Sequence, residues 1–148
     1  MIQNVFHKNV TDELVARINR LNEYSTPEWG KMNVAQMLAH CCVMYEFIYE
    51  NHHPKLGTFK KLLLKWFVKS AVVSEKPYKK SSPTAPEFLI KSDRNFEFEK
   101  QRLVGYLIKT QELGSTYFDG KEYRSFGKLT TREWNNMFYK HLDHHLIQ

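Results

Sequence analysis

Apolar residues recur along most of this chain every three or four positions, which is the spacing of one buried face on an α-helix. The pattern predicts four long helices and one shorter one, over about residues 11–24, 34–53, 58–73, 93–113 and 131–148. No segment shows a convincing strand pattern, and we find no internal repeat and no heptad array. The sequence therefore predicts an all-α fold, built as an antiparallel helical bundle.

Capping motifs predict where three of these helices begin. Thr11 precedes two acidic residues that suit the positive end of a helix dipole, and Asn33 can accept a hydrogen bond from the first turn of the second helix. Thr130 and Glu133 match the capping box, in which each side chain satisfies one unpaired amide group at the start of a helix. The final helix is therefore expected to start at about Thr131.

Two segments between the helices are predicted to be irregular. Residues 76–86 hold three of the five prolines and are expected to form a long surface crossover. Residues 114–129 are expected to turn at Gly120 and Gly127. Because a chain of 148 residues is the size of one domain, neither segment is expected to be a domain boundary, and residues 1–148 are predicted to form a single domain.

Composition narrows the class of protein. Apolar residues make up 42% of the chain and charged residues 26%, which is typical of a folded protein, and the formal charge of +6 favours an anionic partner. The positive charge is concentrated in lysines between residues 55 and 80, and no zinc-finger, helix-turn-helix or RNA-recognition signature occurs, so nucleic acid is not favoured. No apolar run reaches the length of a membrane span and no signal-peptide pattern is present, which predicts a cytoplasmic location. The adjacent Cys41 and Cys42 are expected to be reduced thiols.

Histidines near the end of the chain are the strongest candidates for chemistry. Counted at about 100° per residue, His141 and His145 continue the apolar stripe of the final helix, whereas His144 lies at its edge. Residues four apart lie one above the other on a helix, so these two imidazoles can converge on one cation. The same count turns His40 of the second helix toward the interior. Three inward imidazoles suit a divalent metal with one open coordination position, as in catalytic zinc sites.

Spacing alone leaves a second interpretation open. A histidine on an apolar face can also be a core residue that is hydrogen-bonded to a hydroxyl or a carbonyl group. The remaining histidines, His7, His52 and His53, lie near the chain end or near helix breaks and are expected to be exposed to solvent.

Four segments of the chain resemble the DinB/YfiT-like superfamily of metal-dependent enzymes, and more narrowly a bacterial branch of it that is catalogued as a domain of unknown function. They are residues 29–40 (WGKMNVAQMLAH), 96–100 (FEFEK), 126–134 (FGKLTTREW) and 140–148 (KHLDHHLIQ). The resemblance spans nearly the whole chain. It implies an up-and-down four-helix bundle, here with an extra amphipathic helix, and a metal held by one histidine of the second helix and an H-x3-H pair of the last.

The implied ligands are His40, His141 and His145, the same three that periodicity turns inward. Better-known relatives are transferases and isomerases that use a low-molecular-weight thiol. Many of them follow the last ligand with Arg-Gly-Gln, where this chain has Leu146-Ile147-Gln148, so the anion contact of that arginine is not carried over.

These residues predict a metal-dependent enzyme that acts on a small molecule. A divalent ion on three neutral histidines can activate water or bind a thiolate, which suits a thiol-dependent transferase or a hydrolase. Around the ion, the candidates for lining and supporting contacts are Gln36, Cys41, Tyr45 and His144. Imidazole ligands suit zinc, nickel and iron alike, so the metal stays open. Glu46 lies beside the apolar stripe of the second helix, and a role as general base is a less favoured alternative.

The competing predictions are not enzymatic. The metal can be a purely structural clamp, in which case a chelator would melt the protein. The helix predicted at 58–73 has lysines opposite a large apolar face and can cap the bundle, pair with a second subunit in a homodimer or lie on an anionic membrane. On the sequence alone, capping and pairing are favoured over the membrane.

Overall fold

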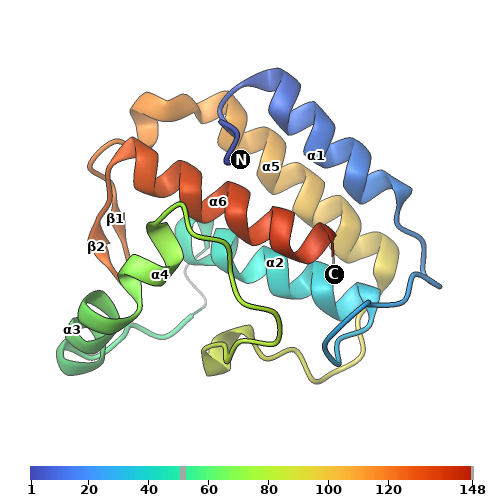
Figure 1. Cartoon of the computed structure of the whole chain (residues 1–148), viewed down its shortest axis with the longest axis horizontal. Helices are drawn as coiled ribbons and strands as arrows, with labels where there is room; N and C mark the ends of the chain where they lie inside the picture. Colours follow the sequence, from blue (N-terminus) through green and yellow to red (C-terminus); the bar gives the residue numbers. More distant parts are fainter. Residues whose placement is uncertain (51–52, 148) are drawn as a thin grey trace.

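The computed structural model describes residues 1–50 and 53–147, and these residues are mainly helical (Figure 1). The helices are α1 (Lys8–Arg20), α2 (Val34–Tyr49), α3 (Thr58–Phe67), α4 (Lys69–Val73), α5 (Phe96–Phe118) and α6 (Thr131–Leu146), with a short 3-10 helix η1 (Pro86–Phe88). Two short strands, β1 (Glu122–Tyr123) and β2 (Gly127–Lys128), complete the described elements. The predicted all-α class is confirmed.

Four of the helices enclose the core. Helix α5 contacts α1, α2 and α6, and α6 also contacts α1 and α2, while α4 packs on the outside of α6 (Figure 1). At the centre, the ring of Phe138 stacks on Tyr45 at 5.3 Å and on Trp134 at 5.5 Å between ring centres. Phe138 and Trp134 have no exposed surface. This aromatic centre fixes the rotation of α6 about its axis, and with it the direction of the histidines one and two turns later.

The predicted capping box at the start of α6 is confirmed, and α2 has one as well. The amide of Glu133 donates to the hydroxyl of Thr130 at 3.3 Å, and the amide of Thr130 donates to the carboxylate of Glu133 at 2.9 Å. At α2 the side chain of Asn33 accepts from the amide of Gln36 at 2.9 Å, and the side chain of Gln36 accepts from the amide of Asn33 at 3.1 Å. Both helices that carry the candidate site therefore start at residues set by local sequence.

The predicted cap at Thr11 is wrong. Helix α1 begins three residues earlier, at Lys8, and the buried hydroxyl of Thr11 donates instead to the carbonyl of Val5 at 2.7 Å. The first helix also ends at Arg20 rather than near residue 24, and the second ends at Tyr49 rather than near residue 53.

Two of the longer predicted helices are interrupted. The helix expected over 58–73 is divided into α3 and α4 at Val68, whose φ of −111° departs from helical geometry. The helix expected over 93–113 begins at Phe96 and continues to Phe118, with a break at Gly114. Gly114 has a φ of 73°, a conformation that glycine adopts without steric cost. The glycine that is predicted to end this helix therefore interrupts it instead.

The expectation that the chain contains no strand is also wrong. Strands β1 and β2 pair antiparallel, with Glu122 opposite Lys128 and Tyr123 opposite Gly127. Gly120 lies in a turn as predicted, whereas Gly127 is the first residue of β2, directly after the turn of the hairpin. Both have positive φ values, 70° and 74°, which glycine adopts without steric cost. Strands of two residues are too short to show an alternating pattern, so they could not be predicted.

Two further observations bear on the class of protein. No helix within residues 1–50 and 53–147 is both long enough and apolar enough to cross a bilayer. Cys41 and Cys42 are free, buried thiols, and burial raises the pKa of each well above the ordinary value. These thiols are therefore protonated at neutral pH and are poor nucleophiles.

Candidate metal centre

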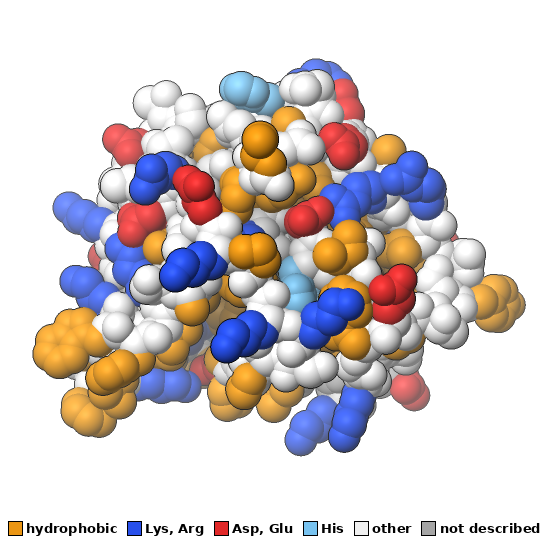
Figure 2. Space-filling model, viewed as in Figure 1, with side chains coloured by type: hydrophobic (Ala, Val, Ile, Leu, Met, Phe, Trp, Pro, Cys, Tyr) orange, Lys and Arg blue, Asp and Glu red, His pale blue; other side chains and the backbone are white. Residues whose placement is uncertain are grey.

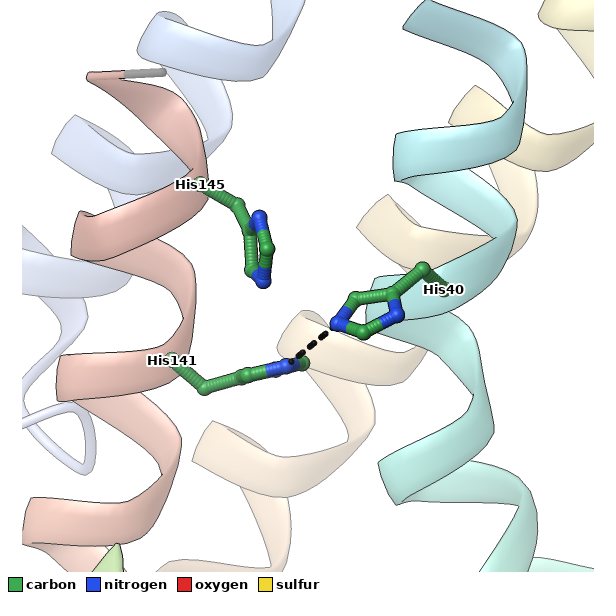
Figure 3. Close-up of side chains that lie close together, drawn as sticks. All are labelled: His40, His141 and His145. Atoms are coloured by element: carbon green, nitrogen blue, oxygen red, sulfur yellow. Dashed lines mark hydrogen bonds between the residues drawn. The ribbon is translucent and has the colours of Figure 1, made fainter. Parts of the chain in front are cut away.

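Three imidazole rings meet between α2 and α6 (Figure 3). His40 comes from α2, and His141 and His145 come from successive turns of α6. The Nε2 atoms of His40 and His141 lie 3.0 Å apart, and the ring of His145 is centred 4.5 Å from that of His40 and 4.9 Å from that of His141. One nitrogen of each ring lies within 4.8 Å of the other two. The inward orientation predicted from periodicity is confirmed for all three.

A backbone contact holds His40 in position. Its Nδ1 atom lies 2.8 Å from the carbonyl oxygen of Phe88, in the short helix η1. Because a carbonyl can only accept, Nδ1 carries the proton and donates it, so in the neutral ring the lone pair is on Nε2. That nitrogen faces the other two rings. Phe88 lies between the crossover predicted at residues 76–86 and the helix predicted to begin at residue 93, so the sequence analysis does not predict this contact.

In His141, the nitrogen that points away from His40 makes no hydrogen bond with the described residues. This nitrogen, Nδ1, is buried. The ring is held between His40, His145 and the edge of Phe88, whose centre is 6.0 Å away. The 3.0 Å approach of the two Nε2 atoms requires either a proton on the Nε2 of His141 or a cation between them, because two lone pairs repel at that distance.

The surroundings keep the imidazoles of His40 and His141 uncharged. Burial lowers the pKa of His40 below the ordinary value of 6.5, and the hydrogen bond from its Nδ1 to Phe88 only partly offsets this effect. Burial lowers the pKa of His141 well below 6.5, and the neighbouring rings of His145, His40 and His144 lower it further. Both side chains are therefore neutral at pH 7 and have lone pairs available for a metal.

The donor set fits a divalent cation. Three neutral imidazole nitrogens are the protein ligands of catalytic zinc sites, which keep a fourth position open. Nitrogens about 2.0–2.1 Å from a tetrahedral ion lie about 3.3–3.4 Å from one another, between the 3.0 Å and 4.8 Å found here.

The three rings form one wall of a cavity of about 350 Å³. Most of the other walls are apolar or aromatic, and these residues come from α2, α3, the hairpin and α6: Met44, Leu64, Val68, Tyr123, Phe126 and Met137. Polar groups lie on the side formed by the two connecting loops, where Lys31, Lys79 and Ser81 contribute. The cavity therefore offers a nitrogen-rich wall opposite a mainly apolar one, at a size suited to a small molecule.

Of the four residues expected to support the site, one lies against it. The ring of His144 is centred 5.0 Å from that of His145 and packs between Trp29 and Tyr78, at 5.7 Å and 5.6 Å. Like the three inward histidines, it lines the cavity.

The other three make contacts elsewhere. Gln36 closes the capping box of α2, and the thiol of Cys41 lies 3.8 Å from the sulfur of Met37. Tyr45 stacks between Phe138 and Tyr106 in the core. Gln36, Cys41 and Tyr45 are thus occupied by capping and packing and do not line the cavity.

Glu46 and His53 belong to a separate network. The carboxylate of Glu46 accepts from the Nε2 of His53 at 2.7 Å and from Arg102 at 2.5 Å, and Arg102 also donates to the buried Glu99 at 2.7 Å. The expected exposure of His53 is therefore wrong, whereas His7 is exposed as predicted. His52 lies outside the described residues. Glu46 is committed to His53 and Arg102 and does not line the cavity.

Fold and site together define an all-α protein with a cluster of three histidines at an internal cavity. Residues 4–148 match the model of a protein family described as a protein of unknown function (DUF1569), and the chain belongs to that family. Neither the comparison with curated proteins nor the comparison with solved structures gives a match.

Proposed function

We propose that this protein is a metal-dependent enzyme related to the DinB/YfiT-like superfamily, an up-and-down four-helix bundle that binds one divalent ion through His40, His141 and His145. The convergence of these three imidazoles on one wall of a cavity carries the proposal (Figure 3). Such an ion supplies a Lewis acid that polarises a bound electrophile or lowers the pKa of a thiol or of water.

The protein's own residues supply binding and orientation. The carbonyl of Phe88 holds the proton of His40 on Nδ1 and leaves Nε2 facing the cavity. Met44, Phe126 and Met137 exclude water and contact the apolar part of a small-molecule substrate. On this basis we propose either transfer from a low-molecular-weight thiol or hydrolysis, in a cytoplasmic enzyme.

Metal analysis of protein purified without a histidine tag tests the site. We expect close to one divalent ion per chain in the parent and loss of the ion in His141→Ala. The matched control is His144→Ala, because this residue is on the same helix and lines the same cavity but lies outside the group of three. Equal metal content in the parent and His141→Ala, or none in either, would refute the proposal.

Removal of the metal separates an enzyme from a structural clamp. The core formed around Trp134 and Phe138 does not involve the imidazoles, so we expect chelated protein to keep its helical circular-dichroism spectrum. A structural clamp predicts the opposite, a chelated protein that unfolds at room temperature. Turnover screens with thiol and ester substrates then become informative, with His141→Ala as the inactive reference.

A further inference from the structure

Helix α3 presents its apolar side chains to solvent. Phe59 and Phe67 are 75% and 74% exposed, Trp66 is 67% exposed, and Leu62 and Leu63 are 41% exposed each. In Figure 2 orange, hydrophobic side chains gather at the lower left, over the position of α3 in Figure 1. A group of five large apolar side chains on one helical face is unusual for a surface that meets only water.

The opposite side of the helix is fixed to the body of the protein. Leu64 is partly buried and lines the cavity. Lys60 pairs with Glu87 at 3.1 Å, and Lys61 pairs with Glu122 in the hairpin. Because α3 is attached on this side, its apolar face points outward. Of the two arrangements that the sequence favours, capping of the bundle and pairing with a second subunit, capping does not fit this exposure.

Lysines border the apolar face. At about 100° per residue, the five apolar side chains occupy an arc of about 140°, with Lys60 beyond one edge and Lys65 beyond the other. An apolar arc bordered by lysines is the arrangement of helices that lie in the plane of a membrane, where lysines reach the lipid headgroups. Lys65 is placed to do so here, whereas Lys60 pairs with Glu87.

Charge favours a bilayer over a second copy of this chain. Residues 55–80 contain eight lysines and a single acidic residue, Glu75. Three of the lysines pair with glutamates of other elements, which leaves a clear excess of positive charge around α3. A symmetric dimer through this face would bring two such surfaces together, whereas anionic lipid headgroups attract them.

We propose that α3 docks on the surface of an anionic lipid bilayer, with Phe59, Trp66 and Phe67 inserted among the headgroups and upper acyl chains. The proposal rests on the exposure of α3 and the charge around it, and it is independent of the metal site. Since Leu64 of α3 and Val68, which directly follows α3, line the cavity, docking places one cavity wall next to the bilayer.

Sedimentation with lipid vesicles tests the proposal. We expect the protein to pellet with vesicles of three parts phosphatidylcholine to one part phosphatidylserine, and to bind pure phosphatidylcholine at least about tenfold more weakly. About 0.5 M NaCl should release most of the bound protein. Trp66 fluorescence should shift to shorter wavelength on binding, and Trp66→Phe should still bind but lose that shift.

A triple variant, Phe59→Gln, Trp66→Gln and Phe67→Gln, should bind the mixed vesicles at least about tenfold more weakly with unchanged circular dichroism, because it removes only exposed side chains. The matched control carries the same change at three exposed apolar residues of α5, Phe98, Ile108 and Leu113, and should bind like the parent. Equal binding by parent and triple variant, or no binding by the parent, overturns the proposal. A parent that sediments as a dimer in the ultracentrifuge, with the triple variant monomeric, would also overturn it and assign the face to a second copy.

Discussion

The buried histidines predict a specific loss of stability in mild acid when no metal is bound. His40 and His141 have lowered pKa values in the folded protein, chiefly because burial disfavours the charged ring. The unfolded chain takes up protons near the ordinary value of 6.5 and the folded chain does not. Stability is therefore complete above about pH 6.5 and falls as the pH is lowered through that value.

The size of the effect follows from proton linkage. Between pH 7.5 and pH 5.5, each histidine that stays neutral in the fold lowers the free energy of unfolding by about 1.4 kcal/mol. If both rings stay neutral down to pH 5.5, the free energy of unfolding falls by about 2.7 kcal/mol over this range. The Nε2 atoms of the pair are 3.0 Å apart, so the two rings do not carry protons on both of these nitrogens at once.

Urea unfolding of chelated protein at pH 7.5, 6.5 and 5.5, followed by circular dichroism, measures this loss. In His141→Gln the loss should be smaller than in the parent by about 1.4 kcal/mol, because the glutamine does not titrate in either state. The control His7→Gln removes an exposed histidine and should match the parent. A parent and a His141→Gln variant with the same dependence on pH would show that the His141 ring takes up protons in the fold, and the argument from burial would be wrong.

Two further predictions concern the scaffold. Thr130→Ala removes the hydroxyl that accepts from the amide of Glu133, and should lower the free energy of unfolding, measured by urea denaturation, by about 1 kcal/mol. The control Thr26→Ala changes an exposed threonine and should have little effect. Equal stabilities of the two variants would contradict the capping role. Burial alone would raise the pKa of Glu46, but hydrogen bonds from His53 and Arg102 more than offset this and lower it. The stability that the Glu46 carboxylate contributes is therefore present above about pH 4.5 and is lost as the pH falls below that value. Glu46→Gln should lose less stability than the parent between pH 5 and pH 3. An equal loss in both proteins would contradict the lowered pKa of Glu46.

The direction of the three histidines could be predicted because it depends on local periodicity. Trp134 and Phe138 mark the buried side of α6, and His141 and His145 continue the same side at helical spacing. The capping box at Thr130 sets where that helix begins. Which histidines of two helices meet across the core does not follow from periodicity alone. Their inward orientation suggests a shared metal, and the resemblance implies the same three ligands.

Other features depend on contacts between distant parts of the chain. The carbonyl of Phe88 accepts a hydrogen bond from His40, which lies 48 positions earlier in the sequence. The pattern of side chains does not predict which backbone carbonyl will be the acceptor. Similarly, the sequence predicts an exposed His53 because it places the end of the second helix near residue 53. The helix ends at Tyr49, and His53 contacts Glu46 and Phe47 of α2. The apolar stripe of 58–73 predicted a buried helix face, but only the arrangement of the whole chain decides that α3 turns this face outward.

X-ray absorption on the parent loaded with one equivalent of zinc tests the central claim most directly. The account predicts three imidazole ligands with zinc–nitrogen distances of about 2.0–2.1 Å and one further light ligand, and fewer imidazoles in His141→Ala. A spectrum with sulfur ligands, or one that is the same for parent and variant, would show that the cluster of His40, His141 and His145 is not the metal site.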